Sequence, residues 1–167
     1  ESNHDVMSGH AGFLLALIAS KNQMSSAVFE NHTRYCKKQL EILLTKIKHD
    51  NKFFLASYAH GITGIYYALF RLYEVTKDKS LVNIIHQFMS LENELYEKKK
   101  QRWKDFRNKK ENRFSHAWCH GSIGIGLAKL ALLRENLGDH NNEHMNAAIT
   151  STMKHGFHTD FSLCHGH

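Results

Sequence analysis

Cysteine and histidine side chains stand together at two places in this sequence, where they could bind a metal ion. Cys119 and His120 directly precede a glycine, and so do Cys164 and His165. Cys119, Cys164 and His165 would make a Cys₂His set, and three protein ligands leave a fourth zinc position open, as in catalytic sites. The separation of the two cysteines fits no zinc-finger spacing. The ordinary alternative for each cysteine is a buried free thiol at the start of a helix.

Three further residues beside glycines could take part in chemistry. His60 precedes a glycine and could act as a general acid or base, because the ordinary pKa of histidine lies near neutrality; a core histidine bonded to backbone is the alternative. Asp5 precedes an apolar run and could be a functional carboxylate or an ordinary helix cap. Trp118 is more often a packing residue than a chemical one. The other histidines are expected at the surface without a role: His4, His32, His49, His86, His140, His144, His155 and His158.

A repeat brings these residues together. The stretches SGHAGFLLAL, HGITGIYYAL and HGSIGIGLAKL each read G-x-x-G followed by an apolar run, and a fourth copy begins at CHGH. Repetition with a period near 50 residues is typical of helical-pair repeats. The repeat therefore predicts one domain over 1–167, with units beginning near 5, 58, 116 and 162. Residues at equivalent repeat positions are expected to converge at one end of the helices.

The segments between the glycine motifs predict the positioning elements. Residues 25–48 and 79–97 carry apolar side chains at helical spacing and should form amphipathic outer helices. The runs after the glycines are apolar nearly all round, which predicts deeply buried inner helices. The chain contains no proline, which permits long helices. We therefore expect an all-α fold made of a double layer of helical hairpins.

The composition indicates a protein without a disulfide framework or a membrane span, with its net positive charge in one segment. A chain of 167 residues is long enough for a core without disulfides, and three widely spaced cysteines favour a reduced, cytoplasmic setting. No apolar run is long enough to span a membrane. The net charge of +6 resides in segment 97–113, which holds nine Lys or Arg and three acidic residues. A solvated linker or exposed helix face is the ordinary interpretation of this segment; an acidic peptide is the expected partner if it binds one, in preference to nucleic acid.

The four motifs, in order, carry a family resemblance. DVMSGHAGFLLAL, YAHGITGIYYAL, WCHGSIGIGLAKL and LCHG resemble the lanthionine synthetase C-like family, and the Cys-His-Gly form is closest to the cyclase region of the class II (LanM-type) lanthipeptide synthetases. The resemblance implies an α/α toroid, of which this chain would be an incomplete portion that exposes apolar faces. It also implies a Zn²⁺ site formed by Cys119, Cys164 and His165.

The same resemblance implies a reaction. Cysteine thiols of a ribosomally made precursor peptide would add to dehydroalanine or dehydrobutyrine and close thioether rings. His60 would be the acid or base, Asp5 its supporting carboxylate, and Trp118 and His120 their neighbours. The peptide's acidic leader is expected to bind segment 97–113, and the parent synthetase to associate with an export transporter. Dehydration and ATP use are not expected within these residues.

The sequence departs from the pattern of standalone cyclases at two positions: His120 stands where they carry Tyr and matches the bifunctional relatives, and Ser115 is the second. Ser115 stands where standalone cyclases carry a basic residue. The role of that basic residue, in supporting the site or in stabilising an enolate, is therefore absent here or is filled by another residue. Arg113 and His116 are the candidates. Two alternatives to a cyclase remain open: a peptide-binding helical solenoid that lacks the chemistry, and a relative that adds glutathione to dehydroamino acids. A glycosidase on a similar fold would need paired carboxylates at the mouth, and too few are present.

Overall fold

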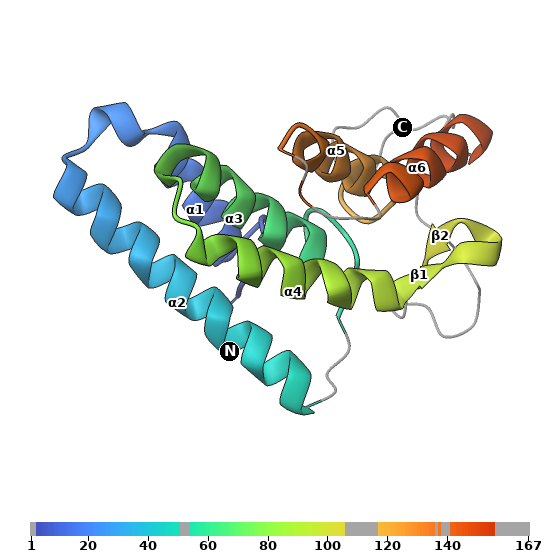
Figure 1. The fold of residues 1–167 in the computed structure, drawn as a ribbon, viewed down its shortest axis with the longest axis horizontal. Coiled ribbons are helices and arrows are strands. Elements are labelled where there is room, and N and C mark those ends of the chain that lie inside the picture. The colour runs from blue at the N-terminus through green and yellow to red at the C-terminus, as the bar shows by residue number, and fades with distance from the viewer. Residues whose placement is uncertain (1–2, 51–53, 106–116, 136, 138–140, 156–167) are drawn as a thin grey trace.

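The structure is a computed structural model that describes residues 3–50, 54–105, 117–135, 137 and 141–155. Its described part is helical apart from one small hairpin, which confirms the all-α prediction (Figure 1). The α-helices are α1 (His10–Ala19), α2 (Ser26–Asp50), α3 (Ile62–Thr76), α4 (Ser80–Leu95), α5 (Ser122–Leu133) and α6 (Asn141–His155). A short 3-10 helix, η1 (Lys21–Gln23), joins α1 to α2.

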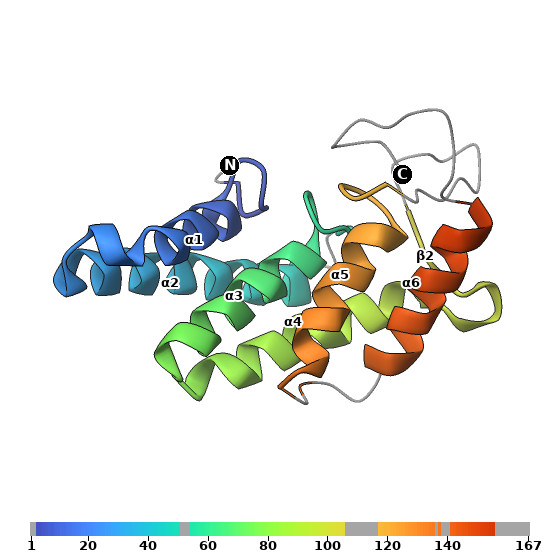
Figure 2. The ribbon, with the colours of Figure 1, turned by 90° about the horizontal axis from the view of Figure 1, so that it is seen from above.

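The helices form pairs arranged in two layers. α1 packs on α2, α3 on α4 and α5 on α6, while α3 lies between α1 and α5 (Figure 2). The row α1, α3 and α5 is the inner layer, and each of its helices begins one residue after the first glycine of its G-x-x-G motif. The two outer helices predicted at 25–48 and 79–97 are α2 and α4. The glycine motifs therefore mark the starts of the inner helices, as expected.

Burial differs along the inner row. The central helix α3 is buried as predicted, and Tyr66 and Phe70 have no exposed surface. α1 departs from the prediction, because Phe13 on its flank is 47% exposed. The difference follows from position: in the described structure α3 has an inner helix on both sides, whereas α1 has α3 on one side only. Cys36, which no motif includes, lies fully buried in α2 and belongs to the core.

Apolar side chains are also exposed at the other end of the row. Leu127 and Leu130 of α5 and Ile149 and Met153 of α6 are each about half exposed or more, and they line a shared groove of roughly 340 Å³. The groove is thus apolar in the part of the chain that the structure describes. Among the described residues, none of the helices is both long enough and apolar enough to cross a membrane.

The first part of the basic segment forms a hairpin, which the sequence did not predict. Strand β1 (Tyr96–Glu97) pairs antiparallel with β2 (Arg102–Trp103), and the 3-10 turn η2 (Lys98–Lys100) joins them. The prediction of a linker or helix face is therefore wrong for these residues. The physical reason is Trp103, whose ring is buried and fixes β2 against the helices. Residues 106–116 lie outside the described part of the chain.

Candidate active site

The three loops that precede the inner helices are joined to one another by backbone hydrogen bonds. The Val6 N–H donates to the Ala59 carbonyl at 3.1 Å, and the Ala59 N–H donates to the Cys119 carbonyl at 3.1 Å. These bonds connect equivalent turns of successive repeats. As a result, the loops that carry Asp5, His60 and Cys119 lie side by side at one end of the inner helices.

The second glycine of each motif permits this close approach. A Cβ atom on Gly64 would stand 1.9 Å from the Tyr58 carbonyl oxygen and 2.5 Å from the Val6 side chain. A Cβ on Gly124 would stand 2.1 Å from the Trp118 carbonyl oxygen and 2.7 Å from Tyr58 Cβ. Any side chain at these two positions would therefore push the loops apart. The glycines serve the site by allowing each loop to pack against its neighbour.

Asp5 and His60 form a direct pair across two of these loops. His60 Nδ1 lies 3.0 Å from Asp5 Oδ2, and the other carboxylate oxygen accepts a hydrogen bond of 2.8 Å from the Ser8 N–H. Burial alone would raise the pKa of Asp5, but the hydrogen bonds from Ser8 and His60 outweigh it and leave this pKa below its ordinary value. Asp5 is therefore a carboxylate that holds the Nδ1–H of His60, which leaves the Nε2 of the ring for other contacts.

Asp5 does not fill the ordinary role of a helix N-cap. The N-cap of α1 is Gly9, and no side chain caps that helix. The Asp5 side chain instead accepts bonds from Ser8 within its own turn and from His60 in the next loop. The side chains of His60 and Asp5 are 36% and 23% exposed, so the pair lies at the surface, where a substrate could reach it.

His120 lies against this pair, and Trp118 belongs to the same loop as His120. The His120 ring stacks on the His60 ring with centroids 4.8 Å apart and planes inclined by 23°. Trp118 is half-buried, and its ring packs on Tyr58 at 5.2 Å. Between them in sequence, Cys119 has no exposed surface. Four of the residues singled out in the sequence, together with Cys119, therefore gather at this end of the helices.

The expected metal ligands are described only in part. Cys164 and His165 lie outside the described residues, as do Ser115, Arg113 and His116. Within the described ranges, no three His, Cys, Asp or Glu side chains are grouped closely enough to hold a metal ion. The chemistry of the donor set suits zinc, since thiolate sulfur and imidazole nitrogen are its ordinary ligands. The buried Cys119 thiol, at the start of α5, fits one ligand position of such a set.

The structure also contains a buried polar cluster centred on Glu92, which the sequence motifs did not predict. The Glu92 carboxylate, on α4, has no exposed surface and lies 2.9 Å from Lys129 Nζ of α5, which is also fully buried. Tyr66 donates its hydroxyl hydrogen to the same carboxylate at 2.6 Å, and the Trp103 indole N–H donates at 2.9 Å. Burial would raise the pKa of Glu92, but Lys129 and the hydrogen-bond donors lower it to about 2.

His144 belongs to this cluster, which corrects its expected surface position. Its Nδ1 lies 3.3 Å from Glu92 Oε1, and the residue is 2% exposed. The ring also packs on Tyr96 and Trp103, at centroid distances of 4.2 and 5.4 Å. The cluster thus ties α3, α4, α5, α6 and the hairpin together. The signals for it in the sequence were a glutamate and a lysine on otherwise apolar helix faces.

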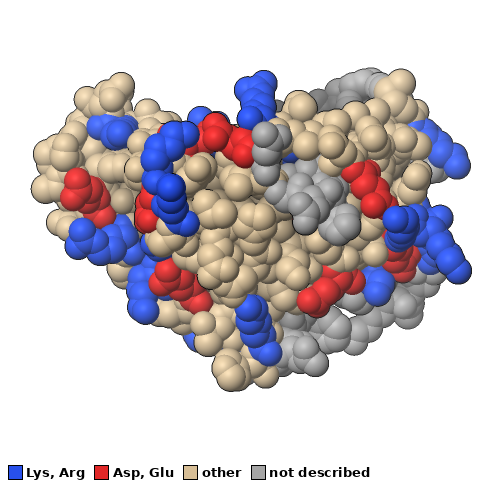
Figure 3. All heavy atoms as spheres, viewed as in Figure 1, with Lys and Arg blue, Asp and Glu red and all other residues tan. Residues whose placement is uncertain are grey.

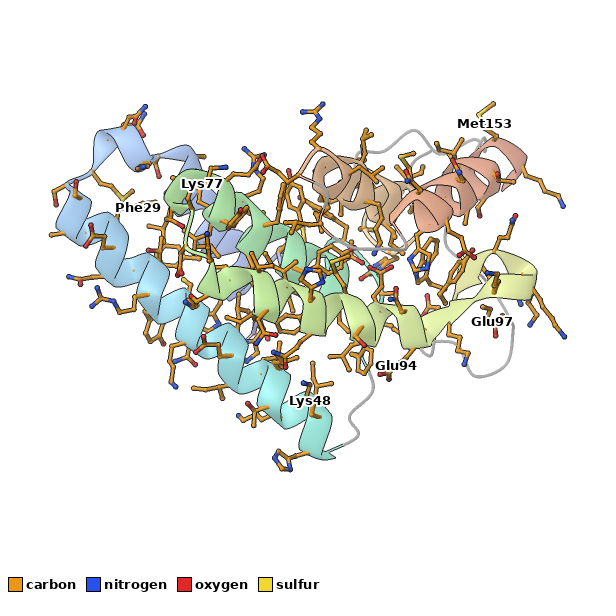
Figure 4. The ribbon with its side chains drawn as sticks, in the orientation of Figure 1. Phe29, Lys48, Lys77, Glu94, Glu97 and Met153 are labelled. Carbon is orange, nitrogen blue, oxygen red and sulfur yellow. The ribbon has the colours of Figure 1, made fainter. Side chains whose placement is uncertain are left out.

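The hairpin carries the basic side chains that the sequence singled out. Lys98 pairs with Glu143 of α6 at 3.2 Å, and Lys100 and Arg102 pair with Glu97. Figure 3 shows Lys and Arg side chains gathered at the end of the molecule that carries β1 and β2, with acidic side chains between them. The labelled Glu97 lies on this hairpin in Figure 4. The basic segment is therefore partly neutralised by its own neighbours.

Comparison with known proteins gives two findings. The family model described as "Lanthionine synthetase C-like protein" matches residues 1–167. A protein of Lactococcus lactis subsp. lactis, described as "Lacticin 481/lactococcin biosynthesis protein LcnDR2", is 32% identical over 174 aligned residues. The alignment covers 97% of this chain and 18% of that relative, so the chain spans less than a fifth of the relative's length.

Proposed function

Because this chain belongs to the lanthionine synthetase C-like family, we propose that it is the cyclase region of a lanthipeptide synthetase. The reaction is the addition of cysteine thiols of a precursor peptide to dehydroalanine or dehydrobutyrine, which forms thioether rings. The similarity to a lacticin biosynthesis protein supports a precursor peptide as substrate. The observation that carries the proposal is the Asp5–His60 pair, which backbone hydrogen bonds hold beside the Cys119 loop.

The metal part of the proposal assigns Zn²⁺ to Cys119, Cys164 and His165. When bound there, zinc would favour the thiolate form of the peptide's cysteine, which is the nucleophile. In support, Cys119 is buried in the loop that leads into α5, and the Ala59 N–H of the His60 loop donates a hydrogen bond to the Cys119 carbonyl. Cys164 and His165 occupy the corresponding place in the fourth copy of the repeat.

His60 acts as the proton donor in this reaction. The peptide thiolate forms a bond to the β-carbon of the dehydro residue, and the π electrons move toward the α-carbon and its carbonyl. The Nε2–H of protonated His60 then delivers a proton to the α-carbon, and the thiol's own proton leaves to solvent, so S–H adds across the double bond. Asp5 holds Nδ1–H at 3.0 Å, which fixes the ring and compensates its positive charge.

His120 lies beside His60, and Trp118 holds the loop that carries His120. His120 limits the rotation of the His60 ring by stacking on it, and Trp118 packs its loop against Tyr58. His120 therefore positions the proton donor directly, and Trp118 does so through the packing of its loop on Tyr58. The precursor peptide is a ribosomal product modified before export, so we place the reaction in the cytoplasm and the parent synthetase beside an export transporter. We assign the peptide's acidic leader to the basic segment 97–113.

Metal analysis of cysteine variants tests the ligand assignment. The full-length protein is purified with Cys119→Ala or, as a matched control, Cys36→Ala, which removes an equally buried thiol from the core of α2. We expect Cys119→Ala to lose zinc and ring formation on a dehydrated precursor peptide, and Cys36→Ala to keep its zinc. Full zinc content in the folded Cys119→Ala protein would refute the assignment.

The same assay separates the alternatives. A wild-type protein that binds the precursor peptide and forms no thioether would be a peptide-binding module. A protein that adds glutathione to dehydroalanine faster than it closes rings would belong to the alternative class of glutathione-adding relatives. Ring closure by the wild type, read by mass spectrometry after alkylation of the remaining free thiols, supports the cyclase.

A further inference from the structure

The loop that carries His60 is closed by two hydrogen bonds between its ends. The Ile62 N–H donates to the Leu55 carbonyl at 2.8 Å, and the Thr63 hydroxyl donates to the Ala56 carbonyl at 2.9 Å. His60 stands between these two closing points in the sequence. The place of the His60 ring therefore depends on where these two bonds hold the ends of the loop.

The equivalent loop of the first repeat is closed by a different donor. There the bond to the corresponding carbonyl, that of His4, comes from the backbone N–H of Ala11 at 3.2 Å. The third repeat carries Ile123 at the position of Ala11. The fold of a repeat unit therefore does not require a hydroxyl at this position. Thr63 is a feature of the loop that carries His60.

The Thr63 hydroxyl makes its bond out of reach of solvent. Thr63 has no exposed surface, and Ala56 is 4% exposed. A hydroxyl has one hydrogen to donate, and the shorter contact is the one to the Ala56 carbonyl; Glu92 Oε2 lies farther away, at 3.4 Å. A buried carbonyl that loses its donor finds no water to replace it, so the bond is costly to remove.

The polar side chains that hold Glu92 also stand where other repeats are apolar. Tyr66 corresponds to Leu14 of the first repeat, and Lys129 corresponds to Leu17. Both contact Glu92 Oε2, at 2.6 Å from the Tyr66 hydroxyl and 2.9 Å from Lys129 Nζ. The packing of the inner helices thus accepts apolar residues at these positions. The polar residues keep one carboxylate oxygen in place beside the bond that closes the loop.

We propose that Thr63 is a positioning residue for His60. The inference rests on the proposed function, because it takes His60 as the proton donor. The Thr63 hydroxyl fixes the start of the loop through the Ala56 carbonyl, and the loop presents the His60 ring to Asp5 at 3.0 Å. Loss of this one bond shifts the ring while leaving every reacting group in the protein.

Ring closure by Thr63→Val and Thr63→Ser tests the proposal. The first variant keeps the size of the side chain and removes the hydroxyl, whereas the second keeps the hydroxyl and removes the methyl group. Both are assayed as zinc-loaded, full-length protein on a dehydrated precursor peptide, well below their thermal midpoints. We expect Thr63→Val to lower kcat about tenfold, because a small misplacement of a reacting group is costly, with KM and zinc content unchanged. Thr63→Ser should keep the wild-type kcat.

Thr33 provides the matched control. It is a buried threonine of α2, 6% exposed, whose hydroxyl donates to the Phe29 carbonyl at 2.9 Å. Thr33→Val therefore loses a buried bond to a backbone carbonyl of the same length, in a helix that carries none of the proposed site residues. We expect it to keep the wild-type kcat whatever happens to its thermal midpoint.

A third variant guards against misfolding of Thr63→Val. Thr63→Ala introduces the residue that the first repeat carries at this position, so the repeat fold accepts it. It also lacks the hydroxyl and should lower kcat to a similar extent, again with KM and zinc content at wild-type values.

Three results would overturn the positioning role. The first is a wild-type kcat in Thr63→Val or Thr63→Ala. The second is an equal loss of kcat in Thr63→Ser, which would assign the effect to packing of the methyl group. The third is an equal loss in Thr33→Val, which would show a general effect of stability.

The wild-type protein in the same assay separates this inference from the proposed function. Failure of the wild type to close rings would refute the proposed function and this inference with it. Ring closure by the wild type together with a wild-type kcat in Thr63→Val would refute the positioning role alone.

Discussion

Two carboxylates of this protein pair with basic side chains, one pair buried in the core and the other partly exposed to solvent. Glu92 and Lys129 are fully buried between α4 and α5, whereas Asp5 and His60 are partly exposed at the starts of α1 and α3. A buried ion pair has lost its hydration and depends on every partner that replaces water. An exposed pair gains little stability but stays accessible. The contrast indicates that the Glu92 cluster holds the scaffold, and that the Asp5–His60 pair is available for chemistry.

The largest expected effect on stability comes from Glu92→Gln. The change leaves Lys129 as a buried charge without a compensating carboxylate, which should cost about 3–5 kcal/mol of folding free energy. Urea unfolding of the purified protein measures it. Glu94→Gln on the same helix is the control, because this side chain is exposed and, as Figure 4 shows, lies at the edge of the molecule. Equal midpoints for the two variants would contradict the scaffold role of Glu92.

Acid should weaken the same cluster. The pKa of Glu92 is lowered to about 2 in the folded protein from its ordinary value of 4.5. A carboxyl group with a lowered pKa stabilises the folded state above its unfolded pKa, and this contribution is lost as the pH falls through the folded pKa. Thermal midpoints measured between about pH 4.5 and 2 should therefore fall more steeply for the wild type than for Glu92→Gln. Parallel curves would show that Glu92 carries no such contribution.

Asp5→Asn should separate stability from activity. The loss of one exposed partner should cost about 1 kcal/mol or less of stability. Ring formation should slow about tenfold, because His60 loses the carboxylate that orients it. Asp78→Asn is the matched control: Asp78 also belongs to an exposed pair, with Lys37 at 3.0 Å, far from the site. An equal loss of ring-forming rate in both variants would contradict the proposal that Asp5 orients His60 for the reaction.

The repeat motifs were sufficient to predict the inner helices and the meeting of the site loops. The second glycine of each motif signals a close approach to the neighbouring loop, as at Gly64 and Gly124, and this approach repeats from one motif to the next, so that successive site loops lie side by side. The outer helices followed from their apolar spacing. The burial of α1 was overestimated, because apolar composition does not say how many neighbours a helix has.

The Glu92 cluster and the hairpin could not be predicted in the same way. Glu92 and Lys129 each interrupt an apolar helix face, which signals that each has a partner, but their separation in sequence hides which partner it is. Trp103 is an apolar residue in a charged run, and its burial turned an expected solvated segment into a hairpin.

The most direct test of the account is the rate of ring closure by His60→Asn. The reaction is followed on a dehydrated precursor peptide with the zinc-loaded, full-length protein, and the thermal midpoint is measured in parallel. We expect the rate to fall by about 10²–10⁴-fold, the usual size of a lost general acid, while the midpoint and the zinc content stay at wild-type values. A His60→Asn protein that closes rings at the wild-type rate would contradict the account.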